Sequence, residues 1–154
     1  MPDRIEKSVE LNAPVSRVWR ALTDYREFGE WFRVKLDAPF VPGQTARGYI
    51  TWPGYEHVLW EALIEKMEPE QLFSFTWAHA KSLDKATYSS DYTGEPRTLV
   101  EFTLEPTATG TLLRLTESGF DKMPADRRDV AFRGNDGGWT QQMDNIAKHV
   151  TEKP

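Results

Sequence analysis

Apolar and polar residues alternate over long parts of the chain, and this alternation is typical of β-strands. Residues 4–11 place Ile5, Val9 and Leu11 on one face and mostly charged or polar residues on the other. The pattern returns several times before residue 117, interrupted by turns rich in glycine and proline. We therefore predict strands at 4–11, 34–36, 46–52, 57–67, 72–77, 98–104 and 111–117.

Segment 57–67 fits two patterns. Positions 58, 60, 62 and 64 are all apolar, which is typical of one face of a strand. Leu59 and Leu63 add apolar residues to the other face, however, and Trp60, Leu63 and Ile64 also have helical spacing. We predict a strand here, with a helix as the alternative.

Near both ends of the chain the apolar spacing changes to that of a helix. Pro14 suits the first turn of a helix, because its missing N–H would have no partner there. We predict amphipathic helices over 14–24 and 138–150. We also expect a short helical turn at 24–32, a short helix around 125–132, and a sharp turn at the glycines of 134–138.

The grouping of strands apart from helices predicts one α+β domain over residues 1–154, with an antiparallel sheet. Residues 80–96 are polar and lack any periodicity, so they form the longest expected loop. We expect this loop and the turn at 24–32 to form the entrance to any internal cavity.

Composition and charge exclude several classes of function. A net charge of −5 with both signs interspersed gives no reason to expect binding to nucleic acid or to an anionic membrane surface. The absence of cysteine excludes disulfides and thiol nucleophiles. The charged N-terminus lacks a signal peptide, and no apolar run is long enough to span a membrane. We therefore expect a cytoplasmic protein.

Four motifs in a fixed order carry a resemblance to a known family. They are the helix motif of 13–24 (APVSRVWRALTD), Phe28-Gly-Glu-Trp-Phe32, Leu115-Thr-Glu-Ser-Gly-Phe120 and Gly138-Trp139. The chain resembles the START-like (SRPBCC) superfamily and, within it, the homologues of the heat-shock-protein ATPase activator's C-terminal domain. The resemblance spans nearly the whole chain.

This resemblance implies a helix-grip fold, in which a curved antiparallel sheet wraps around a long C-terminal helix and encloses an apolar cavity. Many relatives bind lipids, polyketides or plant hormones there, and a minority are enzymes such as aromatase/cyclases. The family's name also suggests a chaperone partner and a role in the stress response.

The aromatic and apolar residues of the predicted strands and last helix are the candidate ligand-binding set. They would either line a cavity or fill a close-packed core, and the sequence is compatible with both. The candidates are Trp31, Phe32, Trp60, Phe73, Phe75, Trp77, Phe102, Leu104, Leu115, Glu117, Trp139, Met143 and Ile146.

Glu117 is the sharpest polar candidate, because alternation places it on the same face as Leu113 and Leu115. A carboxylate there would anchor a ligand hydroxyl or amine. Since a buried charge is costly unless it is paired, we expect a position at the cavity mouth or a partner such as Arg47 or Arg133. The alternative is a strand-end residue in water.

The sequence contains no recognisable catalytic or metal-binding motif. His57, His79 and His149 are scattered without ligand spacing, and we expect them on the surface. We name no catalytic residue, metal or cofactor, and predict a monomer or homodimer that binds a hydrophobic or aromatic small molecule. The alternatives are an enzyme of cyclase or hydrolase type in the same pocket, and a module that contacts a chaperone or another protein.

Overall fold

A computed structural model of the protein describes residues 3–152, which form one seven-stranded antiparallel sheet with helices on one side. The strands follow the order β1-β7-β6-β5-β4-β3-β2. Their bounds are β1 Arg4–Leu11, β2 Val34–Leu36, β3 Thr45–Ile50, β4 Leu59–Glu68, β5 Leu72–Ala78, β6 Arg97–Pro106 and β7 Thr111–Ser118. The helices are α1 Val15–Thr23, α2 Tyr25–Phe32, the short 3-10 turn η1 Phe120–Lys122 and α3 Ala125–Glu152.

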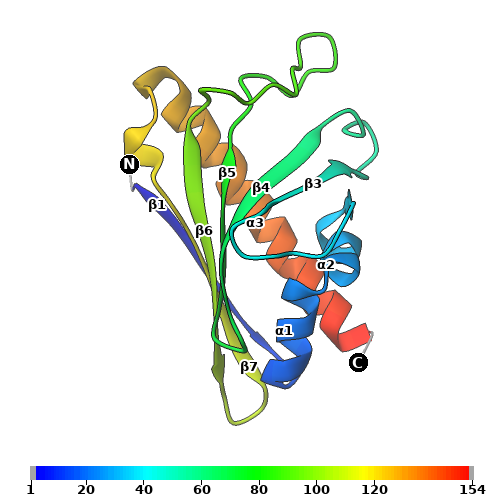
Figure 1. Cartoon of the computed structure of the whole chain (residues 1–154). Coiled ribbons are helices and arrows are strands. Elements are labelled where there is room, and N and C mark those ends of the chain that lie inside the picture. Colours follow the sequence, from blue (N-terminus) through cyan, green and yellow to red (C-terminus); the bar gives the residue numbers. More distant parts are fainter. Residues whose placement is uncertain (1–2, 153–154) are drawn as a thin grey trace.

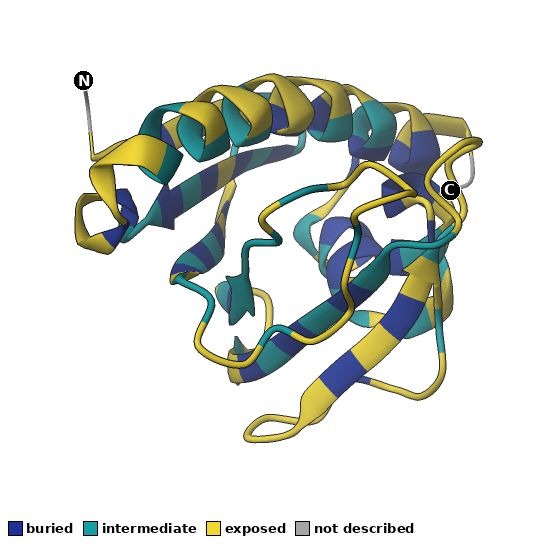
Figure 2. Cartoon of the chain, turned by 90° about the horizontal axis from the view of Figure 1, so that it is seen from above, coloured by how far each residue is buried: buried dark blue, intermediate teal, exposed yellow. Residues whose placement is uncertain are grey.

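The long helix α3 runs diagonally across the curved sheet, with α1 and α2 beside its C-terminal half (Figure 1). Figure 2 shows the same arrangement from above, with buried positions of α3 turned toward the sheet and exposed positions turned outward. The predicted α+β helix-grip fold is therefore confirmed.

Segment 57–67, which fits both a strand and a helix pattern, contains most of the strand β4, and the helical alternative is wrong. In β4, Trp60, Ala62 and Ile64 are buried on one face, as alternation predicts. The register with β5 shifts between Ile64 and Lys66, which marks a β-bulge. Such a bulge bends the strand locally and increases its twist, which fits the curvature of the sheet.

The predicted break before the last helix is wrong. Instead of a short helix, a glycine turn and a second helix, residues 125–152 form the single helix α3. Glycine weakens a helix interior without breaking its hydrogen bonds, at a cost of about 1 kcal/mol per residue relative to alanine. One continuous helix therefore accommodates the three glycines at 134, 137 and 138.

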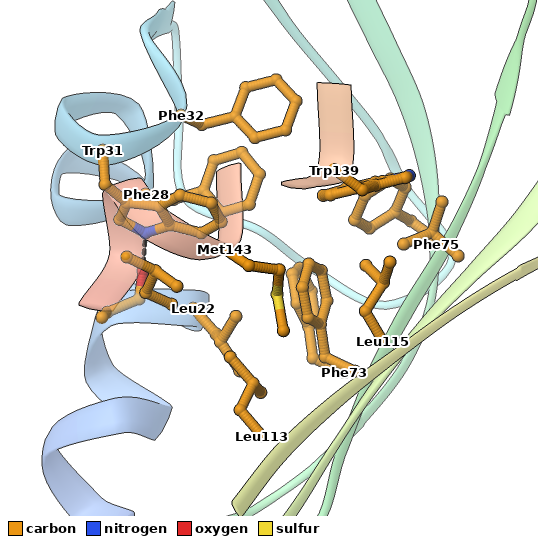
Figure 3. Close-up of a cluster of buried hydrophobic side chains, with 14 of the residues drawn as sticks. Leu22, Phe28, Trp31, Phe32, Phe73, Phe75, Leu113, Leu115, Trp139 and Met143 are labelled. Atoms are coloured by element: carbon orange, nitrogen blue, oxygen red, sulfur yellow. Dashed lines mark hydrogen bonds between the residues drawn. The ribbon is translucent and has the colours of Figure 1, made fainter. Parts of the chain in front are cut away.

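A dense aromatic core joins the helices to the centre of the sheet (Figure 3). Phe28 stacks on Phe32 and meets the edge of Trp31, each with ring centroids 4.9 Å apart. The Trp31 indole N–H donates to the carbonyl of Ala21 at 2.8 Å, which fastens α2 to α1. Because α1 and α2 are fixed in this way, they close one end of the space under α3.

Candidate functional site

A groove separates α3 from the strands β3, β4 and β5. The backbone of α3 lies close to β1, α1, α2 and η1, and its side toward β3, β4 and β5 is more open. Three adjoining cavities of about 480, 390 and 120 Å³ lie on the open side, and neighbouring cavities share wall residues such as Trp60 and Gly138. We call them together the helix–sheet groove. Its main walls are Phe32, Ile50, Val58, Trp60, Trp77, His79, Leu83, Val130, Gly134, Asn135, Gly138 and Gln142.

One face of α3 forms a wall of the groove and is made of small and polar residues. Val130, Gly134, Gly138, Gln142 and Asn145 follow each other at intervals of four, four, four and three. A methyl group added at Gly134 or Gly138 would meet nothing within 4 Å. The glycines therefore face open space and are not required by close packing.

The polar residues of this face also hold the helix in place. Gln142 donates to the carbonyl of Phe32 at 2.9 Å, and Asn145 donates to that of Trp31 at 3.1 Å. These carbonyls lie at the C-terminal end of α2, where four backbone acceptors of a helix lack intrahelical partners. The distance between α2 and α3, and hence the width of this end of the groove, is fixed by these bonds.

Trp60 lies against both large cavities. Its side chain is 5 % exposed, and its ring meets those of Phe28, Phe75 and Phe32. The Trp60 indole N–H is buried without a hydrogen-bond partner among residues 3–152. An unpaired buried donor costs about 1–3 kcal/mol.

The long loop closes one end of the groove and is fastened to β4. Residues 80–96 contain no helix or strand, as predicted. The hydroxyl of Tyr88 accepts from the Leu59 backbone N–H at 2.8 Å, and the hydroxyl of Tyr92 donates to the Leu59 carbonyl at 2.6 Å. These two tyrosines continue the backbone hydrogen bonding at the start of β4 and hold the loop over the first cavity.

Glu117 lies under the groove as the centre of a buried hydrogen-bond cluster. It is 0 % exposed, and both of its oxygens accept hydrogen bonds. The indoles of Trp77 and Trp139 each donate at 2.8 Å, and the Asn135 amide donates at 3.0 Å. The Thr98 hydroxyl donates at 2.5 Å.

Sheet register explains why these residues meet. Trp77 pairs with Thr98 across β5 and β6, and Glu117 pairs with Val100, two residues along β6. Trp139 reaches the same carboxylate from α3.

Hydrogen bonding decides the charge of the Glu117 carboxyl group. Burial by itself raises its pKa, but the His79 side chain 3.5 Å away and the hydrogen bonds from Thr98, Trp77 and Trp139 outweigh burial and hold the pKa below its ordinary value. The carboxylate is therefore ionised at neutral pH. Because both oxygens are occupied by donors, Glu117 holds the helix to the sheet.

Both arginines predicted to neutralise Glu117 are engaged elsewhere, so that expectation is wrong. Arg47 pairs with Glu61 at 2.7 Å, and Arg133 pairs with Asp129 at 3.2 Å. Neutral N–H and O–H donors stabilise the carboxylate in their place, because hydrogen bonds to the charged form favour it even without a full positive charge nearby. The alternative, a strand-end residue in water, is also wrong, because Glu117 is fully buried.

The expectation of surface histidines is wrong at two positions. His79 Nε2 lies 2.7 Å from Thr98 Oγ1 and 3.5 Å from Glu117 Oε2, and the side chain lines the first cavity. His149 is buried and lies 2.9 Å from a carboxylate oxygen of Glu27. Isolated histidines in a sequence carry no signal of the partners that the fold brings to them.

The candidate ligand-binding residues divide into two groups. Phe32, Trp60, Trp77 and Trp139 line the helix–sheet groove. The remaining candidates pack in the core and line none of the three cavities of the groove. These are Trp31, Phe73, Phe75, Phe102, Leu104, Leu115, Glu117, Met143 and Ile146.

Several groove residues are absent from the predicted set, notably His79, Gly134, Asn135, Gly138 and Gln142. A signal for some of them exists in the sequence. Gly134, Gly138 and Gln142 have the spacing of one helix face, and glycine inside a helical period often has a packing or functional reason. This signal is visible only once 125–152 is treated as one helix.

Two further features bear on the class of the protein. Among residues 3–152, no helix is long and apolar enough to cross a membrane. The same residues contain no group of three or more side chains of the metal-binding types placed to hold an ion.

Comparison with known proteins defines the family. The model of the family "Activator of Hsp90 ATPase homolog 1-like protein" matches residues 12–151, and the chain therefore belongs to this family. No curated protein matches the sequence.

Solved structures share the fold over nearly the whole chain. Protein MLL2253 from Mesorhizobium loti is 26% identical, with a TM-score of 0.76 and 98% of each chain covered. DynU16, a putative protein in the dynemicin biosynthetic locus, is 23% identical with a TM-score of 0.72, and the match covers 98% of this chain and 48% of that one. The Aha1 dimer from Colwellia psychrerythraea is 16% identical with a TM-score of 0.70, and 96% and 95% of the two chains are covered.

Proposed function

We propose that this protein binds an apolar, aromatic small molecule in the helix–sheet groove. The observation that carries the proposal is the pair of adjoining cavities of about 480 and 390 Å³ between α3 and the open part of the sheet. Small-molecule sites typically have about 300–1,000 Å³, with mostly apolar walls and a few polar groups. The groove has this composition, with Trp60, Trp77 and Ile50 opposite the polar face of α3.

The glycines of α3 support this function. Gly134 and Gly138 each weaken the helix by about 1 kcal/mol relative to alanine, and no neighbouring atom requires their small size. Their effect is to leave room between the helix backbone and the indole rings across the groove. A flat ring system fits such a space better than a branched aliphatic chain does.

The distribution of exposed apolar residues also supports this function. Of the large apolar side chains that are exposed, Trp52, Tyr55, Leu83 and Val130 line the cavities. Exposed apolar groups that gather at one concave place mark a binding surface. A ligand seated there would cover them and gain hydrophobic contact at the groove mouth.

Native mass spectrometry tests the proposal. The protein is measured as purified and after exposure to a pool of lipids, flavonoids and polyketide-like aromatics, and we expect a stoichiometric adduct. Gly138→Leu fills the groove and should abolish the adduct. Gly137→Leu places the same side chain one residue earlier, at a position that lines none of the described cavities, and should retain it. A bare polypeptide mass throughout would contradict the proposal.

A further inference from the structure

Counting donors and acceptors around Glu117 fixes the positions of the protons. The ionised carboxylate can only accept hydrogen bonds. The Thr98 hydroxyl has a single hydrogen, and the short contact with Glu117 Oε2 uses it. The Thr98 oxygen must therefore act as the acceptor toward every other neighbour. Trp77 Nε1, 3.1 Å away, is one of them.

The same count fixes the tautomer of His79. Its Nε2 lies 2.7 Å from Thr98 Oγ1, and since that oxygen has no hydrogen left to give, Nε2 must carry the hydrogen and donate it. The other ring nitrogen, Nδ1, has no hydrogen-bond partner among residues 3–152. It is also not fully buried, because the fully buried side-chain atoms without a partner in this part of the chain do not include it. His79 lines the first cavity, so this nitrogen remains available to a molecule bound there.

We propose that Nδ1 of His79 anchors a weakly acidic hydroxyl group, a phenol or an enol, on the aromatic ligand. Thr98 and Glu117 act as positioning residues, because they hold the Nε2 side of the imidazole and leave Nδ1 free. This inference rests on the proposed function of the groove and names the polar group that its ligand carries.

A weakly acidic hydroxyl suits this nitrogen, because the ligand O–H donates to the lone pair of Nδ1. An ether oxygen has no such hydrogen and cannot make this bond.

Two charged residues that line the first cavity, Glu61 and Arg127, are engaged within the protein. Glu61 pairs with Arg47 at 2.7 Å. Arg127 donates to the His79 carbonyl at 2.8 Å and pairs with Glu95 at 3.3 Å, so it is already engaged. A ligand carboxylate would bring a full negative charge toward the buried charge of Glu117. A phenol enters the groove neutral and avoids this repulsion.

The test compares 2-naphthol with 2-methoxynaphthalene, which share a ring system and differ in the acidic hydrogen. Isothermal titration calorimetry of the wild-type protein should give a dissociation constant roughly three- to tenfold lower for 2-naphthol, the value of one hydrogen bond. In His79→Phe the two ligands should bind equally. His57→Phe, at a histidine outside the described cavities, should keep the preference for 2-naphthol.

The outcomes separate this inference from the proposed function. Equal binding of both ligands to the wild-type protein overturns the role of His79 and leaves the groove as a ligand site. Binding of neither contradicts the proposed function, and the anchor with it.

If His79→Phe does not fold, nitrogen NMR of the wild-type protein gives the answer without a variant. The Nδ1 resonance of His79 should shift with 2-naphthol and stay unchanged with the ether, whereas the same response to both ligands overturns the anchor.

Discussion

Trp139 on α3 donates its indole N–H to Oε1 of Glu117 on β7 at 2.8 Å, which joins the long helix directly to the sheet that it covers. Trp77 makes the matching bond to Oε2 from β5 at the same distance. The rings of Trp77 and Trp139 stack with centroids 5.6 Å apart. One buried carboxylate thus organises two indoles at the base of the groove.

Replacing this carboxylate should destabilise the protein strongly. In Glu117→Gln an NH₂ group replaces one of the two carboxylate oxygens. It then faces either the Trp139 donor at the Oε1 position or the Trp77 and Thr98 donors at the Oε2 position. Each buried donor left without an acceptor costs about 1–3 kcal/mol. Urea unfolding should therefore show a loss of several kcal/mol. Glu105→Gln, at an exposed carboxylate paired with Arg114, should change the free energy of unfolding by less than about 1 kcal/mol. Similar losses in the two variants would refute the structural role of Glu117.

The acid sensitivity of the protein should depend on the same residue. Because the folded-state pKa of Glu117 lies below its ordinary value of 4.5, the stabilisation is present above about that pH and is lost as the pH falls through the folded-state pKa. Glu27 contributes in the same direction. Burial raises the pKa of Glu27, but hydrogen bonds from His149, Arg17 and Arg20 outweigh burial and lower the pKa.

The measurement is the free energy of unfolding of the wild type and of Glu117→Gln between pH 6 and pH 2. This pH range brackets 4.5, the ordinary pKa of a glutamate carboxyl group. We expect the wild type to lose stability below about pH 4.5 and the variant to lose less of it. The remaining slope comes from the other carboxyl groups with lowered pKa values, which are Glu27, Glu56 and Asp91. Parallel curves would mean that Glu117 has no depressed pKa.

Replacing a glycine that lines the groove should raise the stability of the protein and weaken ligand binding. Gly134→Ala adds a methyl group in open space, so it should raise the free energy of unfolding by about 1 kcal/mol while it narrows the groove and weakens ligand binding. Gly137→Ala should stabilise the helix by a similar amount without affecting binding, because Gly137 lines none of the described cavities. Thermal unfolding and the affinity for 2-naphthol measure the two effects, and unchanged affinity in Gly134→Ala would speak against the groove.

The core and the groove should respond differently to truncation. Phe102 is fully buried and lines none of the described cavities, so Phe102→Ala should cost about 3–5 kcal/mol of stability. Trp60→Phe removes a buried N–H that has no partner, and this gain in stability offsets part of the loss in packing. The main effect of the substitution should therefore be weaker ligand binding. Denaturant unfolding and calorimetric titration of both variants check this contrast. If Trp60→Phe loses stability without losing affinity, Trp60 belongs to the core alone.

The sequence by itself determined most of the strands and the first helix and which way their faces point, but not the unbroken helix α3. Alternation in 4–11 and 111–117 and helical spacing in 14–24 are local properties, because side chains alternate every two residues in a strand and repeat every 3.6 in a helix. The order of these elements then determined an antiparallel α+β fold, and the family motifs specified the helix-grip arrangement.

Only the tertiary structure decided the surroundings of Glu117 and the shape of the groove. Trp77, Thr98, Asn135 and Trp139 lie 18 to 40 residues from Glu117 in the sequence. Sheet register together with the path of α3 brings them to this one carboxylate. The sequence also left open whether the aromatic residues fill the core or line a cavity. Phe73, Phe75 and Phe102 pack solidly while Trp60 borders open space, because packing of α3 against β1, α1 and α2 leaves the side facing β3–β5 uncovered.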